Sequence, residues 1–387
     1  MEYNKSSLIT NKKHYKKSGV KSVGDSTTFV SVLQKEEAKK KKKKLTWLFL
    51  IVNVLIVAAI FIYQFGFHET KPLSELFAEK PFYRYFFISL GLLLVFYTSL
   101  GTGYSIFMKR LIGKYRPWLG IQLAIVGKYW DAITPFGTGG QFAQISYARK
   151  YGLTSDKSTS IVVGKYMTGM IALTIVGIAV LFVPVSTFTT GTIIKILAAV
   201  GIGINILITV FVWLVSMNKK MCSFIVVGGL KLLHKMHIVK DYNKALYKTL
   251  RFIRQYQKAF VYFFKNPLII ISQILLSLIE LVAIALIAYM VYLAFNPNGD
   301  VSAITIVAMS FLCSFATTFI PLPGGSGAAE VSFAALFSQL FSDGAVFWAL
   351  IFWRVLSYYI IVALGFIFTL IEPAVYRSIR IKKEKNK

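Results

Sequence analysis

Residues 317–330 read Thr-Thr-Phe-Ile-Pro-Leu-Pro-Gly-Gly-Ser-Gly-Ala-Ala-Glu, a proline and glycine break between two apolar, helix-forming stretches. Proline removes a helix hydrogen-bond donor, and adjacent glycines let the backbone turn where side chains would not fit. At membrane depth, broken backbone survives only where protein or a water-filled cavity satisfies its polar groups. The stretch therefore predicts a re-entrant helical hairpin over 301–341 with its tip inside the protein. A plain loop at the membrane surface is the alternative.

A second break of the same kind lies earlier in the chain. Residues 131–141 read Asp-Ala-Ile-Thr-Pro-Phe-Gly-Thr-Gly-Gly-Gln, again between apolar arms. This break predicts a second re-entrant hairpin over 117–150. The breaks themselves are assigned to Pro135 in the first hairpin, and to Pro321 and Pro323 in the second.

The two hairpins precede segments that match each other. Each hairpin leads into a short polar turn and then into an apolar span with one basic residue inside it, Lys165 or Arg354. Pro135 precedes Lys165 by 30 positions, and Pro321 precedes Arg354 by 33. The match predicts an inverted-topology repeat, in which a substrate site lies near the midplane between the halves. Coincidence of two breaks is the alternative.

The composition agrees with a membrane protein. The chain has 387 residues, of which 56% are hydrophobic and 16% charged, whereas soluble domains carry about 25% charged residues. Six apolar stretches are long enough to cross about 30 Å of hydrocarbon as helices: 45–65, 82–108, 158–183, 191–216, 267–295 and 344–370. The sequence therefore predicts an all-α polytopic membrane protein with about six full spans plus two re-entrant helical hairpins in an inverted repeat. With only two cysteines, a disulfide scaffold is excluded.

The positive charge is distributed as in a membrane protein and not as in a nucleic-acid-binding one. Of the 44 Lys and Arg residues, 37 lie in five segments on what is predicted to be one side: 1–44, 109–116, 149–157, 217–266 and 371–387. By the positive-inside rule, both termini are expected in the cytoplasm. The sequence therefore predicts a multi-pass protein of the cytoplasmic membrane. The net charge of +28 also favours contact with anionic lipids of the inner leaflet.

These observations divide the chain into five parts. Residues 1–44 are expected to be a disordered basic tail, and 45–216 the first membrane half. Residues 217–266 alternate apolar and basic residues at helical spacing, which predicts amphipathic helices on the cytoplasmic membrane surface. Residues 267–370 form the second membrane half, and 371–387 a basic cytoplasmic tail.

Charged residues inside the predicted membrane segments are the candidate functional residues. A charge at a helix centre costs about 2.5–3.5 kcal/mol on insertion scales, so each needs a partner, water or a neutral state. The six residues are Lys128, Asp131, Lys165, Glu280, Glu330 and Arg354.

Spacing and chemistry suggest partners for some of these charges. Lys128 and Asp131 are three apart, which favours a local ion pair. Arg354 cannot lose its proton, so it needs a carboxylate or a phosphate, and Glu330 is the obvious protein partner.

In the functional interpretation, Lys165 and Arg354 hold the anionic headgroup of a lipid, and Glu280 or Glu330 serves as counter-charge or proton carrier. Backbone N–H groups at the glycine turns would add phosphate donors. The glycines concerned are Gly139, Gly140, Gly324, Gly325 and Gly327.

Several enzyme signatures are absent from the sequence. It has no Asp-x-Asp, no Walker A motif, no Gly-x-Ser-x-Gly and no His-Glu-x-x-His. Accordingly, we predict no catalytic residue, no metal site and no cofactor.

The two breaks resemble the twin signatures of the lysylphosphatidylglycerol synthase/flippase transmembrane family, and the resemblance covers about 45–370. It implies a bacterial or archaeal lipid translocase that moves an anionic phospholipid, an aminoacylated phosphatidylglycerol or a polyprenyl-phosphate-linked lipid between leaflets. Full-length relatives resemble a flippase fused to a cytosolic domain that transfers lysine to phosphatidylglycerol and so supports resistance to cationic peptides. No such domain is expected before the chain ends at Lys387.

Two other functions stay open at this point. One is a lipid-modifying transferase of the phosphatidylglycerol lysyltransferase type. In that case Glu69, Glu75 or Glu79 of the loop 66–81, on the side opposite to the basic segments, would be catalytic. The other is a non-catalytic lipid-binding subunit that anchors a partner through 217–266. A homo-oligomer or a soluble partner enzyme is compatible with each of them, and no nucleic-acid partner is expected.

Overall fold

The structure is a computed structural model that describes residues 81–184, 192–236, 241–296, 298–317, 320–341 and 345–385. All of these belong to one compact unit, Asn53–Lys387. The predicted tail 1–44 and the predicted first span 45–65 lie outside the described residues.

The described residues form helices and no strand. In chain order they are α4 (Pro81–Ile112), α5 (Pro117–Ile133), η1 (Pro135–Gly137), α6 (Gly139–Lys150), α7 (Ser155–Val180), α8 (Thr192–Met217), α9 (Lys219–Lys235), α10 (Tyr242–Phe264), α11 (Pro267–Phe295), α12 (Ala303–Thr317), η3 (Pro323–Gly325), α13 (Ala328–Phe337), η4 (Ser338–Leu340), α14 (Ala345–Arg354), η5 (Val355–Tyr359) and α15 (Ile360–Lys385).

Five segments of the described chain are long and apolar enough to cross a membrane: Phe82–Ile112, Ser155–Val180, Ile196–Met217, Pro267–Phe295 and Ala345–Glu372. They coincide with five of the six predicted spans. The prediction of an all-α polytopic membrane protein is confirmed. The last span is not one regular helix, because the π-helical segment η5 separates α14 from α15.

The arms of the two broken hairpins are shorter than these spans. In the first hairpin α5 has 17 residues and α6 has 12; in the second α12 has 15 and α13 has 10. A spanning helix needs about 20 residues. Each hairpin therefore has arms that reach inward and turn back rather than crossing.

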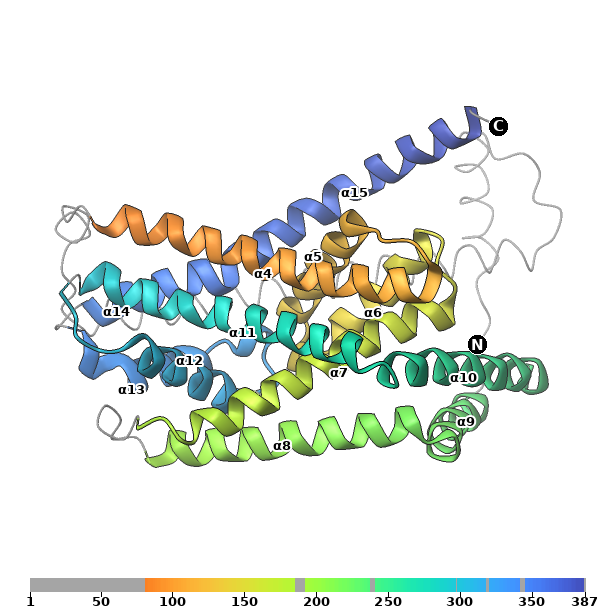
Figure 1. The fold of residues 1–387 in the computed structure, drawn as a ribbon, viewed down its shortest axis with the longest axis horizontal. Coiled ribbons are helices and arrows are strands. Elements are labelled where there is room, and N and C mark those ends of the chain that lie inside the picture. The colour runs from red at the N-terminus through yellow and green to blue at the C-terminus, as the bar shows by residue number, and fades with distance from the viewer. Residues whose placement is uncertain are drawn as a thin grey trace, which may run out of the picture. The chain divides into compact units, whose positions relative to one another are not determined.

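The helices form two halves of the same order. The first is α4, the hairpin α5–α6 and α7; the second is α11, the hairpin α12–α13 and the last span α14–α15. Figure 1 shows α4 and α11 side by side with opposite chain directions, so the hairpins occupy opposite ends of the bundle. This arrangement is the predicted inverted repeat.

Each hairpin packs into its own apolar core. Leu123 and Ala124 of α5 lie with Phe107 of α4 in one cluster of fully buried residues. Phe333 of α13 stacks on Trp353 of α14 at 4.9 Å in the other. Gly101 of α4 and Gly120 of α5 let these two backbones approach closely, as small residues do between membrane helices.

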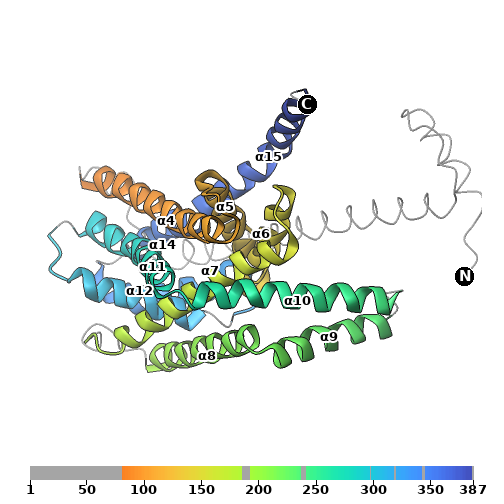
Figure 2. The ribbon, with the colours of Figure 1, turned by 45° about the vertical axis from the view of Figure 1, so that its right-hand side comes forward.

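The segment after α8 forms two helices, α9 and α10, within the predicted amphipathic stretch 217–266. They lie side by side (Figure 2), and α10 packs against α7. Ile253, Tyr256 and Phe260 of α10 are buried with Cys222 of α9. α10 is therefore amphipathic as predicted: its apolar face packs inside the protein, and basic residues of the opposite face, such as Arg254 and Lys258, are exposed.

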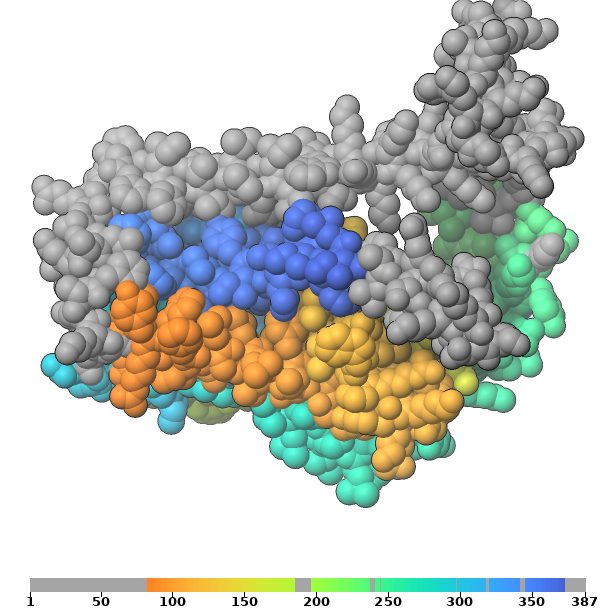
Figure 3. Space-filling view, turned by 90° about the horizontal axis from the view of Figure 1, so that it is seen from above, coloured from red at the N-terminus to blue at the C-terminus, as the bar shows by residue number. Residues whose placement is uncertain are grey.

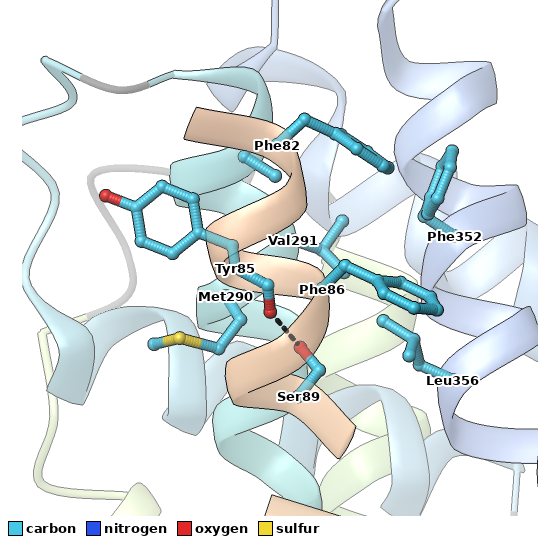
Figure 4. A pocket seen from close by; sticks show the side chains of 9 residues that line it. Phe82, Tyr85, Phe86, Ser89, Met290, Val291, Phe352 and Leu356 are labelled. Atoms are coloured by element: carbon cyan, nitrogen blue, oxygen red, sulfur yellow. Dashed lines mark hydrogen bonds between the residues drawn. The ribbon is translucent and has the colours of Figure 1, made fainter. Parts of the chain in front are cut away.

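The beginning of α4 packs against the last span. Figure 3 shows the two side by side on one face of the described chain, and the rings of Phe82 and Phe352 lie 4.4 Å apart. Between them and α11 lies an apolar pocket of about 10 Å³ (Figure 4). This volume admits about one water molecule, so the pocket is a packing defect and not a ligand site.

Candidate functional site

The tips of the two hairpins have the same backbone turn. In the first, Gly137 N–H donates to the Thr134 carbonyl at 3.2 Å; in the second, Gly325 N–H donates to the Leu322 carbonyl at 3.0 Å. The glycines have φ of 60° in both tips. This left-handed conformation favours glycine, so it explains why both breaks contain one.

The residue before each of these glycines is also left-handed. Gly324 has φ 62° in the second tip, whereas the first tip places Phe136 there with φ 55°. Left-handed backbone at a bulky residue is an outlier that surrounding structure must hold in place. Phe136 thus shows that the first tip is strained where the second is not.

The matching turns correct the predicted register of the repeat. Pro135 begins one turn and Pro323, not Pro321, begins the other. Pro135 lies 30 positions before Lys165 (165 − 135), and Pro323 lies 31 before Arg354 (354 − 323). The spacing between the proline and the buried cation is therefore nearly equal in the two halves, and more nearly so than when it is counted from Pro321. The sequence offered two prolines, and only the backbone distinguishes them.

The tips meet each other. The turn η1 contacts η3, and η3 also contacts α5. Tyr358 of η5 reinforces this junction, because its hydroxyl donates to the Ala132 carbonyl at 3.0 Å. A Cβ on Gly324 would collide with the Tyr358 ring. Sequence reasoning missed Tyr358, since a tyrosine within an apolar span gives no signal of its own.

A buried ion pair follows the first hairpin. The Lys165 ammonium on α7 donates to Glu280 Oε1 on α11 at 2.7 Å and to Ser277 Oγ at 2.8 Å. Lys165 is 2% exposed and Glu280 is 7% exposed. Gln273 lies one helical turn before Ser277 on α11 and is completely buried. Its Oε1 has no hydrogen-bond partner among the described residues. The carboxylate that Lys165 needs comes from the other half of the molecule.

A second buried pair follows the second hairpin. Arg354 Nε donates to Glu330 Oε1 at 2.7 Å, which confirms Glu330 as its protein partner. The other carboxylate oxygen accepts from Gly327 N–H at 2.6 Å, and Arg354 Nη1 donates to the Gly324 carbonyl at 3.3 Å. Two glycines of the tip are thereby tied to the pair. Arg354 Nη2 is buried and has no hydrogen-bond partner within the described part of the chain.

The remaining predicted site residues lie at the first tip. Asp131 Oδ1 accepts from Gly140 N–H at 2.9 Å, and Thr134 Oγ1 accepts from Gly139 N–H, also at 2.9 Å. The expected local pair between Lys128 and Asp131 is absent from the ion pairs of the described residues. The carboxylate instead caps the N-terminal end of α6. The Lys128 ammonium lies 5.5 Å from the centre of the Phe96 ring.

Each half of the molecule contributes the cation of one buried ion pair, and each cation is neutralised by one carboxylate. Arg354 contacts its hairpin tip through the Gly324 carbonyl, whereas the hydrogen bonds of Lys165 go to α11. Among the described residues, no group of three or more His, Cys, Asp or Glu side chains could hold a metal ion. Pro321 is exposed and lies in the break between α12 and η3, before the turn that Pro323 begins.

Comparison with known proteins identifies the family. The family model described as the lysylphosphatidylglycerol synthase TM region matches residues 47–365. No curated protein and no solved structure matches the chain. The family implies a role connected with membrane lipids. Since its model covers most of the sequence, both hairpins and both ion pairs included, the chain belongs to the lysylphosphatidylglycerol synthase transmembrane family.

Proposed function

We propose that the protein is a lipid translocase that moves the phosphate-bearing headgroup of an anionic lipid between leaflets. One observation carries the proposal: two broken hairpins reach in from opposite ends of the bundle, and their tips touch. In transporters with inverted repeats, the substrate site is usually formed by broken helices near the membrane midplane. The two halves then move against each other around this site.

The two ion pairs supply the chemistry for a phosphate. A phosphate in hydrocarbon needs fixed hydrogen-bond donors, because an unpaired charge there costs several kcal/mol. Arg354 presents a flat fork of donors suited to phosphate, and its Nη2 has no partner among the described residues. Lys165 offers a point charge in the other half.

The carboxylates would let the cations exist without substrate. Glu280 neutralises Lys165 and Glu330 neutralises Arg354 when no phosphate is present. A headgroup phosphate would share or replace these contacts, and the displaced carboxylate would act as counter-charge or take a proton. Gly139 and Gly327 lie at the N-terminal ends of α6 and α13, and a headgroup phosphate would compete with Thr134 and Glu330 for their N–H groups.

The setting of this activity is inferred from the charge distribution. We infer a cytoplasmic membrane location with both termini in the cytoplasm, because the basic segments gather on that side. The lipid moved would be an anionic phospholipid, an aminoacylated phosphatidylglycerol or a polyprenyl-phosphate-linked lipid.

A leaflet-exchange assay tests the proposal. Purified protein is placed in vesicles with a fluorescent anionic phospholipid, and an impermeant quencher reports how much label remains in the inner leaflet. We expect the labelled lipid to lose its protection from the quencher faster in vesicles with the protein than in protein-free vesicles. With the Lys165→Gln variant, this loss should be slower than with the wild-type protein. Equal protection in the two vesicle preparations would contradict the proposal. Appearance of a chemically modified lipid would point to the transferase.

A further inference from the structure

A groove away from the hairpins has the features of a second phosphate site. It has a volume of about 420 Å³ and is lined by α7, α9 and α10. Small-molecule sites in proteins have about 300–1,000 Å³. The lining residues are Ser155, Asp156, Val226, Lys248, Thr249, Arg251, Phe252 and Gln255.

The cations of the groove come from one face of α10. Lys248 and Arg251 are three positions apart and Phe252 and Gln255 continue the same face, since residues three and four apart are neighbours on a helix. Both cations are exposed, and neither forms an ion pair with another described residue. Ser155 on α7 and Thr249 on α10 add hydroxyl groups that donate or accept hydrogen bonds.

The groove lies where lipid headgroups are found. Ser155 is the first residue of α7 and of a candidate membrane span, so the groove lies at one end of that span, where a spanning helix meets the headgroup region. Large apolar side chains near it are exposed: Tyr247 is 70% exposed and Leu250 is 46% exposed. Aromatic and aliphatic side chains next to cations are typical of contact with the membrane interface.

We propose that this groove binds a phosphate group, with Lys248 and Arg251 as its charge partners and the hydroxyl of Ser155 as a further donor. Arg251 supplies the fork that matches phosphate oxygens, and Lys248 supplies a second positive charge. Val226 and Phe252 form the apolar part of the lining, against which the glycerol part of a headgroup would rest. Asp156 is the single acid in the lining and limits the net charge to one positive unit. The site is separate from the ion pairs of the hairpins and does not depend on the proposed translocation.

The test compares two double variants of equal charge. Lys248→Ala with Arg251→Ala removes the proposed partners; Arg254→Ala with Lys258→Ala removes two exposed cations of α10 that do not line the groove. Binding is measured by native mass spectrometry and fluorescence titration, using nanodiscs with phosphatidylglycerol in phosphatidylcholine, and soluble glycerol 3-phosphate as competitor.

We expect the groove variant to lose about tenfold or more in affinity for phosphatidylglycerol, since two charge-assisted hydrogen bonds are worth at least that. The control variant should retain wild-type affinity within about twofold. Equal losses in both variants would overturn the proposal, because binding would then depend on net charge alone. Competition by glycerol 3-phosphate would identify a free phosphate compound as sufficient, and its failure would restrict the ligand to a bilayer lipid; both results support the site. No loss in the groove variant would exclude it.

Discussion

The pair formed by Glu330 and Arg354 allows a quantitative test of the second half of the site. Arg354→Gln leaves the Glu330 carboxylate buried, and among the described residues the Gly327 N–H, at 2.6 Å, is then its remaining donor. Removing one member of a buried ion pair costs about 3–5 kcal/mol, because the other charge stays behind unpaired. Glu330→Gln should cost a similar amount for the same reason.

The double variant should behave differently from either single one. With Arg354→Gln and Glu330→Gln together, no charge remains buried at this place, and we expect a coupling energy of about 2–3 kcal/mol, near the upper end for contacting residues. Stability is measured as the free energy of unfolding in a detergent titration. Translocation, measured in vesicles, should not recover, since the phosphate donor is gone.

A matched control separates burial from charge. Lys150 and Glu372 also form an ion pair, at 2.6 Å, but the lysine side chain is 35% exposed. Lys150→Gln should therefore cost less than about 1 kcal/mol. If Arg354→Gln costs no more than this control, the buried pair does not stabilise the fold. If the double variant translocates lipid like the wild type, Arg354 is not a headgroup contact.

The tips, the first ion pair and the topology each give one further prediction. Gly324→Ala should abolish translocation and destabilise the protein, because φ is 62° and the new methyl group meets the Tyr358 ring, whereas Gly169→Ala, with open space around it, should be neutral in activity and thermal stability assays. Lys165→Gln should lower the free energy of unfolding by about 3–5 kcal/mol in the same detergent titration, and an unchanged value would show that its carboxylate partner is not buried as described. A single cysteine at Ser74 should react with an impermeant thiol reagent in intact cells while one at Ser7 should not; strong labelling at Ser7 would reverse the orientation derived from the basic segments.

The sequence predicted the architecture because, at membrane depth, a proline and glycine break between apolar arms is tolerated only where protein or a water-filled cavity surrounds it. It also identified Glu330 as the partner of Arg354, since these residues lie 24 positions apart within one hairpin and the span after it. The partner of Lys165 could not be assigned in this way. Glu280 is 115 positions away and belongs to the other half, and only the packing of α7 against α11 brings them together.

Local spacing misled in one place and could not decide in another. Lys128 and Asp131 have ideal helical spacing for a pair, but Asp131 lies at the end of α5, where the N–H of Gly140 competes for its carboxylate. The left-handed Phe136 could not be predicted from the sequence, because such backbone is rare for a bulky residue and favours glycine. Both cases concern the first tip, whose hydrogen bonds from Gly139 to Thr134 and from Gly140 to Asp131 lie within the hairpin itself.

The proposed translocation places the substrate site where the two hairpin tips meet, so the lipid headgroup is expected to pass between them, and linking the tips tests this most directly. Phe136→Cys and Leu322→Cys place one thiol in each tip, while the two native cysteines, Cys222 and Cys313, are buried. The thiols are joined by a short cleavable reagent after reconstitution, and headgroup movement is followed in the same vesicles before linking, after linking and after cleavage. We predict that movement stops when the tips are linked and returns when the linker is cut. Unchanged movement in the fully linked protein would contradict the account, because the path could not then run between the tips.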